Sequence, residues 1–307
     1  MRADETVAVR ATAPGPGGIA VVEVIGPRAR EVVGRFVKVG RGLVRGRIVD
    51  EVLVRWAPRH GEPVVEVSCH GGDQPARAVI DALGMREVDR AFVLERAVAS
   101  RRLDRTRAEA LLLLPRALTL RAARMLQDQA AGALSRARSR EALLETAPLG
   151  LALASPRRIV IAGAPNVGKS TLFNALVERD RALVSPVAGS TRDPVEETIA
   201  IDGIPFVLVD TAGASRGTEL ERMATERAEA QKRKADLVLT LGARREPWTA
   251  RELTALRRRI VRDLGLAVKP PPGAPCVFTE RQKAALGSPR WKRELLWGNT
   301  PPVSAIR

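Results

Sequence analysis

Gly163-Ala164-Pro165-Asn166-Val167-Gly168-Lys169-Ser170 is a complete G-x-x-x-x-G-K-S sequence, and it decides the fold of the second half of this chain. An apolar run, residues 158–162, precedes it, and an amphipathic segment, residues 171–177, follows it. A glycine-rich turn from a strand into a helix lets successive backbone N–H groups converge on phosphate oxygens, and the helix adds the positive end of its dipole. Because a strand and a helix flank the motif, the sequence predicts a phosphate-binding loop rather than a chance match.

Two residues of this loop have distinct expected roles. Lys169 should reach the β- and γ-phosphates of a nucleotide, and Ser170 should place its hydroxyl on Mg²⁺. The remaining expected nucleotide contacts in this segment come from Asn166, Val167, Gly168 and Thr171.

A second motif, Asp210-Thr211-Ala212-Gly213, ends another apolar run, residues 204–209. We expect Asp210 to hold the Mg²⁺ shell, and the N–H of Gly213 to approach the terminal phosphate because glycine has no Cβ. Between the two motifs, Thr191 is a candidate switch threonine that completes the Mg²⁺ shell. Taken alone it would more often be an ordinary loop threonine; its position between two phosphate-binding elements favours the switch role.

Local patterns predict the elements around these motifs. Asp202-Gly203 separates two apolar runs and tolerates the positive φ angles of a tight turn, so residues 199–207 predict a β-hairpin that adds an antiparallel edge strand to a parallel sheet. In the amino-terminal third, alternating runs predict an α+β module, with the last helix closed by Gly84. Its expected strands are residues 6–12, 19–25, 48–56 and 63–68, and its expected helices are residues 28–36 and 73–83.

The order of these segments resembles the MnmE/TrmE family of tRNA-modification GTPases. In the second half the resemblance covers the phosphate loop, Leu172-Phe173-Asn174-Ala175-Leu176, residues 188–193 and residues 210–213. In the first half, residues 12–19, Ile25-Gly26 and Cys69-His70-Gly71-Gly72 are similar to a formyl-tetrahydrofolate-binding domain. The resemblance implies an α/β chain with an incomplete Ras-like sheet and four parts: a folate-binding-like domain (1–102), a shortened helical domain (103–154), a P-loop G domain (155–245) and a truncated carboxy-terminal helical remnant (246–307).

The resemblance also implies chemistry and partners. The family hydrolyses GTP in tRNA wobble-uridine modification with Mg²⁺ and K⁺, and the ion site would comprise Asn166, Ser185, Val187 and Ser190, where K⁺ takes the role of an arginine finger. Glu221 would orient the attacking water indirectly, although a solvated helix glutamate explains that residue equally well. Further implied partners are 5-formyl-tetrahydrofolate, tRNA, a partner tRNA-modification enzyme and a second copy bound through the amino-terminal domain.

The chain departs from the family in places that bear on function. No Asn-Lys-x-Asp motif, whose aspartate accepts the N–H groups of guanine, follows the strand-like run 237–241, and no cysteine follows Cys276. Residues 275–279 are either a fifth strand with a degraded motif or a remnant of the carboxy-terminal helical segment after an internal deletion; we favour the second. In the folate turn, Pro16 stands where the family has arginine. These departures leave open a catalytically impaired pseudo-GTPase scaffold that binds nucleotide or a protein partner, and a nucleotide-independent RNA-binding protein.

The composition bears on the partners and the compartment of the protein but does not identify its function. The 307 residues carry a formal net charge of +16, which suits a polyanion such as tRNA but equally suits an arginine-rich base composition. Aromatic residues are only 3%, with no tyrosine, which disfavours a base-stacking platform. Two cysteines cannot form a disulfide framework, so we expect a reducing cytoplasm. We expect no membrane helix, and residues 1–5 do not resemble a signal peptide.

Overall fold

The computed structural model describes residues 5–12, 15, 17–38, 41–44, 47–180, 196–210, 226, 229–242 and 246–298. The chain separates into two compact units, one of Met1–Ala108 with Asn299–Arg307 and one of Glu109–Gly298. Each unit has an apolar core of its own.

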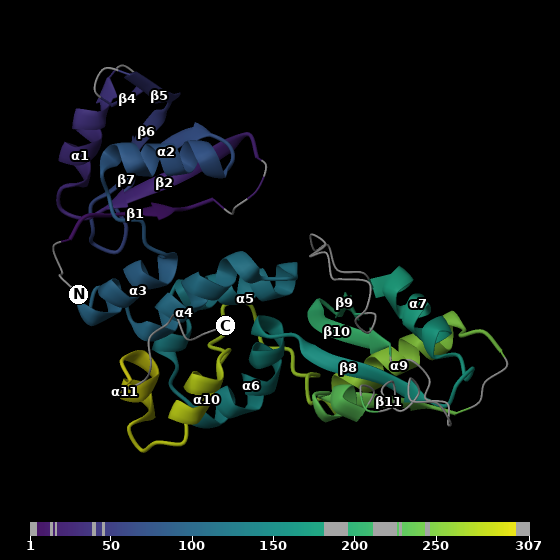
Figure 1. The fold of residues 1–307 in the computed structure, drawn as a ribbon. Coiled ribbons are helices and arrows are strands. Elements are labelled where there is room, and N and C mark those ends of the chain that lie inside the picture. Colours follow the sequence, from purple (N-terminus) through teal and green to yellow (C-terminus); the bar gives the residue numbers. More distant parts are fainter. Residues whose placement is uncertain are drawn as a thin grey trace. The chain divides into compact units, whose positions relative to one another are not determined.

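The first unit is built on a four-stranded antiparallel sheet in the order β1-β2-β7-β6 (Figure 1). Valine-rich β2 and β7 are its centre, and their side chains share one apolar core with two helices. The strands are β1 (Val7–Arg10), β2 (Ile19–Ile25), β6 (Leu53–Trp56) and β7 (Val64–His70), and the helices are α1 (Ala29–Phe36), α2 (Asp73–Leu83) and α3 (Arg90–Ala99). Gly84 closes α2 in the left-handed conformation, as predicted.

The single strand predicted for residues 48–56 was wrong. The structure divides it into β5 (Arg47–Glu51) and β6, on either side of the buried Val52. β5 pairs with β4 (Arg41–Val44), which pairs with β3 (Val37–Lys38), in a separate three-stranded sheet. The prediction failed because alternation of apolar residues reports which face a side chain occupies and not which strand its backbone pairs with.

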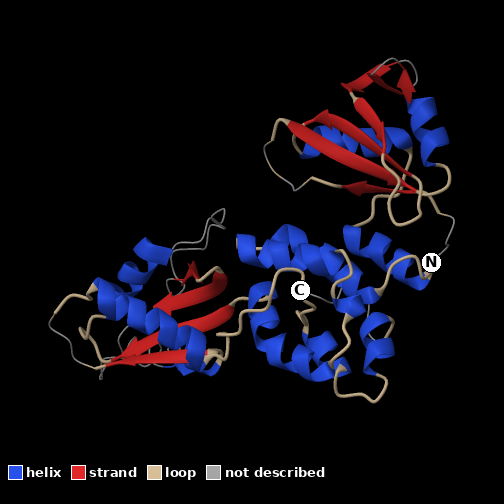
Figure 2. Cartoon of the chain, turned by 180° about the vertical axis from the view of Figure 1, so that it is seen from behind, coloured by secondary structure: helices blue, strands red, loops and turns tan. Residues whose placement is uncertain are grey.

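In Figure 2 the second unit combines a part that contains a sheet with a group of helices. Thr119, Ser139 and Thr279 start three of them, because each hydroxyl accepts a hydrogen bond from a backbone N–H of the first turn. The helices are α4 (Arg105–Leu113), which crosses the division between the units, then α5 (Leu120–Ala130), α6 (Arg140–Ala154), α10 (Glu280–Ala285) and α11 (Trp291–Leu296), with short 3-10 turns at Leu114–Arg116 and Leu134–Arg136.

A four-stranded sheet in the order β11-β8-β10-β9 lies between these helical segments in the sequence. Its strands are β8 (Arg157–Gly163), β9 (Glu196–Ile201), β10 (Ile204–Asp210) and β11 (Leu237–Leu241). β8 is parallel to both neighbours, whereas β9 is antiparallel to β10. Asp202 and Gly203 have φ angles of 52° and 74°, so the predicted hairpin and its edge strand are confirmed.

Two helices share the apolar core of this sheet. They are α7 (Lys169–Asp180) and α9 (Ala250–Asp263), and Arg257 of α9 pairs with the buried Asp180 of α7 at 2.9 Å. Because α9 belongs to this core, the packing unit around the sheet extends past residue 245, where the sequence places a domain boundary. The boundaries themselves remain a proposal.

Residues 275–279 form no strand. They lie against helices instead: the Gln129 side chain of α5 donates to the carbonyl of Ala274 at 3.1 Å and accepts from the N–H of Cys276 at 3.2 Å. A Cβ on Gly150 of α6 would lie 2.1 Å from the carbonyl oxygen of Val277, so only glycine permits this approach. The structure therefore shows no fifth strand at these residues, and the helical remnant stays a prediction.

Candidate functional site

The phosphate loop links the end of β8 to the start of α7, as the sequence predicts. Its backbone turns through positive φ angles at Gly163 (152°), Asn166 (60°) and Gly168 (91°). A Cβ on Gly163 would lie 2.7 Å from the carbonyl oxygen of Leu241 in β11, so glycine is required where the loop leaves the sheet. This close approach fixes the beginning of the loop against the neighbouring strand.

Lys169 lies inside the loop. Its ammonium group donates to the carbonyl oxygens of Ala164, at 2.8 Å, and Gly163, at 3.2 Å, and the residue is only 6% exposed. A positive charge held at the centre of a turn that also carries the N-terminus of α7 attracts an anion. Phosphate oxygens would compete with these two carbonyls for the same ammonium protons.

Ser170, in the first turn of α7, contacts Asp210 at the end of β10. The Ser170 hydroxyl donates to Oδ2 of Asp210 at 2.7 Å, while Oδ1 of Asp210 is buried and has no hydrogen-bond partner within the described residues. An unpaired buried carboxylate oxygen is costly unless a ligand or ion satisfies it. The Ser170 hydroxyl and the unpaired Oδ1 of Asp210 are oxygen ligands of the kind that Mg²⁺ prefers.

The sheet topology explains why these residues meet. β8, β10 and β11 run parallel, so their carboxyl ends share one edge, and Gly163 and Asp210 are the last residues of β8 and β10. Open parallel sheets bind ligands beyond the carboxyl ends of their strands. Sequence analysis did not anticipate the carbonyl of Leu241, whose only signal is that it ends the next apolar run.

The other predicted site residues divide into two groups. Asn166 and Thr171 are exposed on the loop and on α7, Val167 is buried, and Gly168 leads into the helix, so these four lie where the prediction puts them. The remaining predicted residues lie outside the described part of the chain: Ser185, Val187, Ser190, Thr191, Thr211, Ala212, Gly213 and Glu221.

In the first unit, the glycines that resemble a folate turn pack against each other. Gly71 donates its N–H to the carbonyl of Gly18 at 3.1 Å, and a Cβ on Gly71 would lie 1.7 Å from the carbonyl oxygen of Gly17. This contact alone requires glycine at position 71. Beside it, His70 pairs with Asp50, whose hydrogen bond and charge raise the pKa of the imidazole.

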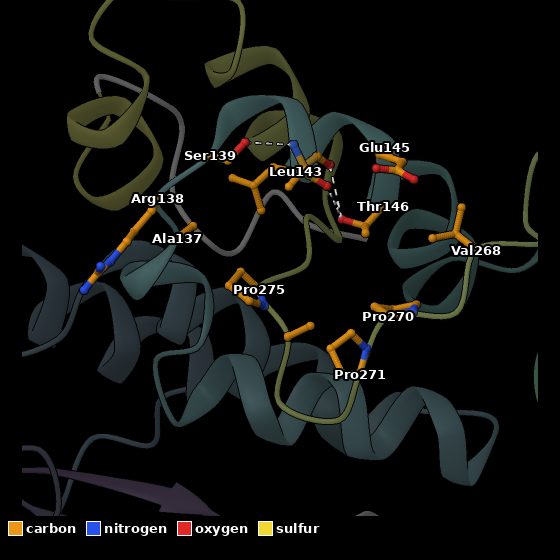
Figure 3. Close-up of a pocket in the computed structure, with 12 residues that line it drawn as sticks. Ala137, Arg138, Ser139, Leu143, Glu145, Thr146, Val268, Pro270, Pro271 and Pro275 are labelled. Atoms are coloured by element: carbon orange, nitrogen blue, oxygen red, sulfur yellow. Dashed lines mark hydrogen bonds between the residues drawn. The ribbon is translucent and has the colours of Figure 1, made fainter.

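A pocket of about 310 Å³ lies in the helical part of the second unit (Figure 3). The beginning of α6, with Leu143 and Thr146, faces Pro270, Pro271 and Pro275 across it. The Thr146 hydroxyl donates to the carbonyl of Ala142 within its own helix. The lining is mostly apolar and shares no residue with the phosphate loop.

The described residues also bear on metal binding and on membranes. No group of three or more His, Cys, Asp or Glu side chains there is arranged to hold a metal ion. Among the same residues, no helix has the length and apolar character needed to cross a membrane. Both cysteines are free and buried.

Comparison with protein families matches both units. The profile of the 50S ribosome-binding GTPase family matches residues 158–267, and that of the GTP-binding protein TrmE N-terminus matches residues 6–97. The chain is 34% identical to the tRNA modification GTPase MnmE of Chloroflexus aurantiacus over 80% of its own length and 68% of the relative's. It is 35% identical to the same protein of Heliobacterium modesticaldum, over 82% and 69% of the two lengths.

Solved structures were compared as well. The G domain of the T. maritima FeoB iron transporter is 28% identical, with a TM-score of 0.22, over 34% of this chain and 65% of that one. Aquifex aeolicus Era bound to GDP and AlF₄⁻ is 26% identical, with a TM-score of 0.23, over 45% and 44% of the two chains.

Proposed function

The chain belongs to the MnmE/TrmE family of tRNA-modification GTPases, and from this premise we propose that it binds and hydrolyses a nucleoside triphosphate at the phosphate loop with help from Mg²⁺ and K⁺. The observation that carries the proposal is the pairing of Ser170 with Asp210 beside an enclosed Lys169. Mg²⁺, when bound, supplies positive charge next to the β- and γ-phosphate oxygens. Lys169 would hold the same oxygens, and Asp210 would orient the metal shell.

A potassium role is supported by Asn166. This residue is exposed on the loop and held at a φ of 60°, a conformation that asparagine tolerates better than most residues. Its side-chain oxygen is a donor suited to a hard cation, and we assign Ser185, Val187 and Ser190 as its companions from the family resemblance. We assign Thr191 to the Mg²⁺ shell and Glu221 to the attacking water on the same ground.

A phosphate-release assay tests the proposal. We expect turnover of Mg·GTP in KCl that falls by at least about tenfold in NaCl, because a cation between α- and γ-phosphates offsets charge in the transition state. Lys169→Ala should abolish turnover, whereas Lys292→Ala, which removes a lysine of α11, should leave it unchanged. Equal and negligible release in both salts, with Lys169→Ala indistinguishable from the unsubstituted protein, would reject catalysis.

The alternative is a pseudo-GTPase scaffold that binds nucleotide or a protein partner without hydrolysis. It is favoured by the short sheet, which stops at β11 within the described residues, and by the lost base-recognition motif. Saturable nucleotide binding with no turnover in either salt would select this alternative. Robust turnover in KCl would exclude it.

The remaining proposals concern partners. We propose a homodimer through the first unit, supported by the edge strand β6, where Leu53 is 76% exposed and Trp56 41%. Leu53→Glu should shift the mass measured by light scattering from dimer to monomer if this edge is the interface. We also propose action on tRNA in the cytoplasm with a partner modification enzyme, supported by the family and the net charge of +16.

Folate binding is supported by the family resemblance. The close approach of Gly71 to Gly17 requires glycine at position 71 whether or not folate binds. The test of folate binding is therefore a direct measurement. Isothermal titration with 5-formyl-tetrahydrofolate should give saturable heat. A titration without heat would contradict folate binding.

A further inference from the structure

We propose that the nucleotide site selects its ligand by the triphosphate chain and does not discriminate between guanine and adenine. This inference rests on the proposed function, because it names the class of substrate that the phosphate loop accepts. It assigns to this chain a specificity different from that of the family to which it belongs.

The first support is the lateral edge of the sheet. In a Ras-like G domain the strand that carries Asn-Lys-x-Asp follows the strand equivalent to β11. In the described residues β11 pairs only with β8, and Val238 on this edge strand is 36% exposed. The described residues therefore provide no strand beside β11 from which an aspartate would reach the base.

The second support is the position of the apolar segment that follows β11 at the distance expected for that strand. Residues 275–279 are fixed in the helical part by Gln129, which hydrogen-bonds to the backbone of Ala274 and Cys276. Val277 and Phe278 are almost fully buried, at 0% and 2% exposure, and Thr279 caps α10. Moving this segment to the edge of β11 would expose the buried side chains of Val277 and Phe278.

The third support comes from the acidic and amide side chains themselves. The sequence contains three asparagines, Asn166, Asn174 and Asn299, and none begins an Asn-Lys-x-Asp motif. Asp236, the acidic residue next to β11, precedes the strand and pairs with Arg157 at 2.9 Å. It therefore lies at the amino end of β11, opposite the edge at which the loop binds phosphate.

The groups that would bind phosphate remain in place at the same time. Lys169 is enclosed by the loop, and Ser170 meets Asp210. A site that pairs a buried acceptor with a base rejects the wrong base by about 10⁴-fold or more. A site without that acceptor lacks this source of discrimination between bases. The phosphate chain, common to all nucleoside triphosphates, then carries the binding energy.

A competition titration tests this inference. A ribose-labelled fluorescent GTP analogue is bound to the full chain in Mg²⁺ and displaced with GTP, ATP or inorganic tripolyphosphate. We expect the inhibition constants of GTP and ATP to agree within about tenfold, and tripolyphosphate also to displace the probe. Lys169→Ala should lose the probe altogether, and Lys292→Ala should bind as the unsubstituted protein does, with circular dichroism confirming that both variants fold.

The outcomes separate the inference from the proposed function. Displacement by GTP at concentrations more than tenfold below those of ATP overturns the inference and leaves the proposed function standing. Failure of tripolyphosphate to displace the probe at any concentration overturns it as well, because a nucleoside would then be required. A probe that does not bind, or that binds Lys169→Ala equally well, overturns both.

Discussion

Two carboxylates of the second unit are held in opposite ways. Glu109 of α4 is 1% exposed, and both of its oxygens are satisfied: Oε1 accepts from Arg281, and Oε2 accepts from Arg281, Gln282 and Thr279. Asp210, at the end of β10, accepts one hydrogen bond from Ser170 on Oδ2, while its other oxygen is buried without a partner in the described residues.

The difference separates structural from functional acidic residues. A buried charge with a full set of donors stabilises the fold only as long as every partner stays in place. A buried charge with an unused oxygen is kept at a cost in stability, and such groups concentrate where a ligand or ion completes them. On this ground Glu109 holds α10 to α4, whereas the unpaired oxygen of Asp210 is consistent with the proposed cation site.

The largest effect should follow removal of the satisfied carboxylate. Glu109→Ala removes the buried carboxylate that pairs with Arg281 and accepts from Gln282, so we expect the free energy of unfolding to fall by about 3–5 kcal/mol. Urea denaturation measures this directly. Asp263→Asn, which breaks an exposed pair with Arg259, is the control and should cost less than about 1 kcal/mol. Equal losses in the two variants would contradict the comparison.

Asp210→Asn should behave in the opposite way. Because the charge is only partly satisfied, we expect its removal to change the free energy of unfolding by no more than about 1 kcal/mol. Mg²⁺-dependent affinity for nucleotide should fall by about 10- to 100-fold, since the proposed function assigns this residue to the metal shell. Titration of nucleotide with and without Mg²⁺ provides the measurement. A large loss of stability with unchanged affinity would place Asp210 in the same class as Glu109.

A smaller effect is expected at the other end of β10. The Thr119 hydroxyl caps α5 and donates to the carbonyl of Gly203 at 2.7 Å, which anchors the hairpin tip to the helical part. Thr119→Val should lower the free energy of unfolding by about 1–2 kcal/mol, as expected for loss of an N-cap. Its affinity for Mg²⁺ and nucleotide should not change. If the affinity for Mg²⁺ and nucleotide falls instead, the hairpin affects Asp210. Thr119 would then contribute to the site as well as to stability.

The sequence predicts those features that depend on neighbouring residues. The phosphate loop, the Asp202-Gly203 hairpin and the glycine that closes α2 were predicted because each depends on backbone conformation within a few positions. These local conformations follow from the steric preferences of the individual residue types.

The sequence does not predict which distant polar residues pair. Glu109 and Gln282 are separated by 173 positions, and Gln129 and Cys276 by 147. Periodicity predicts which face of a helix a residue occupies but says nothing about its distant partner. For the same reason residues 275–279 admitted two interpretations until their hydrogen-bond partners were known.

The smallest effect concerns a satisfied carboxylate in the first unit. Asp50 accepts hydrogen bonds from the backbone and the ring of His70, and this partner raises the pKa of His70 above its ordinary 6.5. His60 differs: burial, together with the charges of Arg107 and Arg59, lowers its pKa. Since the chain has only two histidines, nuclear magnetic resonance should resolve two imidazole titrations, one above 6.5 and one below.

The raised pKa also fixes the sign of a stability effect. A histidine whose pKa is higher in the folded state contributes stability that is full below 6.5 and is lost as pH rises through the folded value. The melting temperature of the unsubstituted protein should therefore exceed that of His70→Gln most below pH 6.5, and the difference should shrink above it. For His60→Gln the trend reverses, because a lowered pKa contributes stability that is lost as pH falls. Parallel trends in the two variants would show that hydrogen bonding to Asp50 does not control His70.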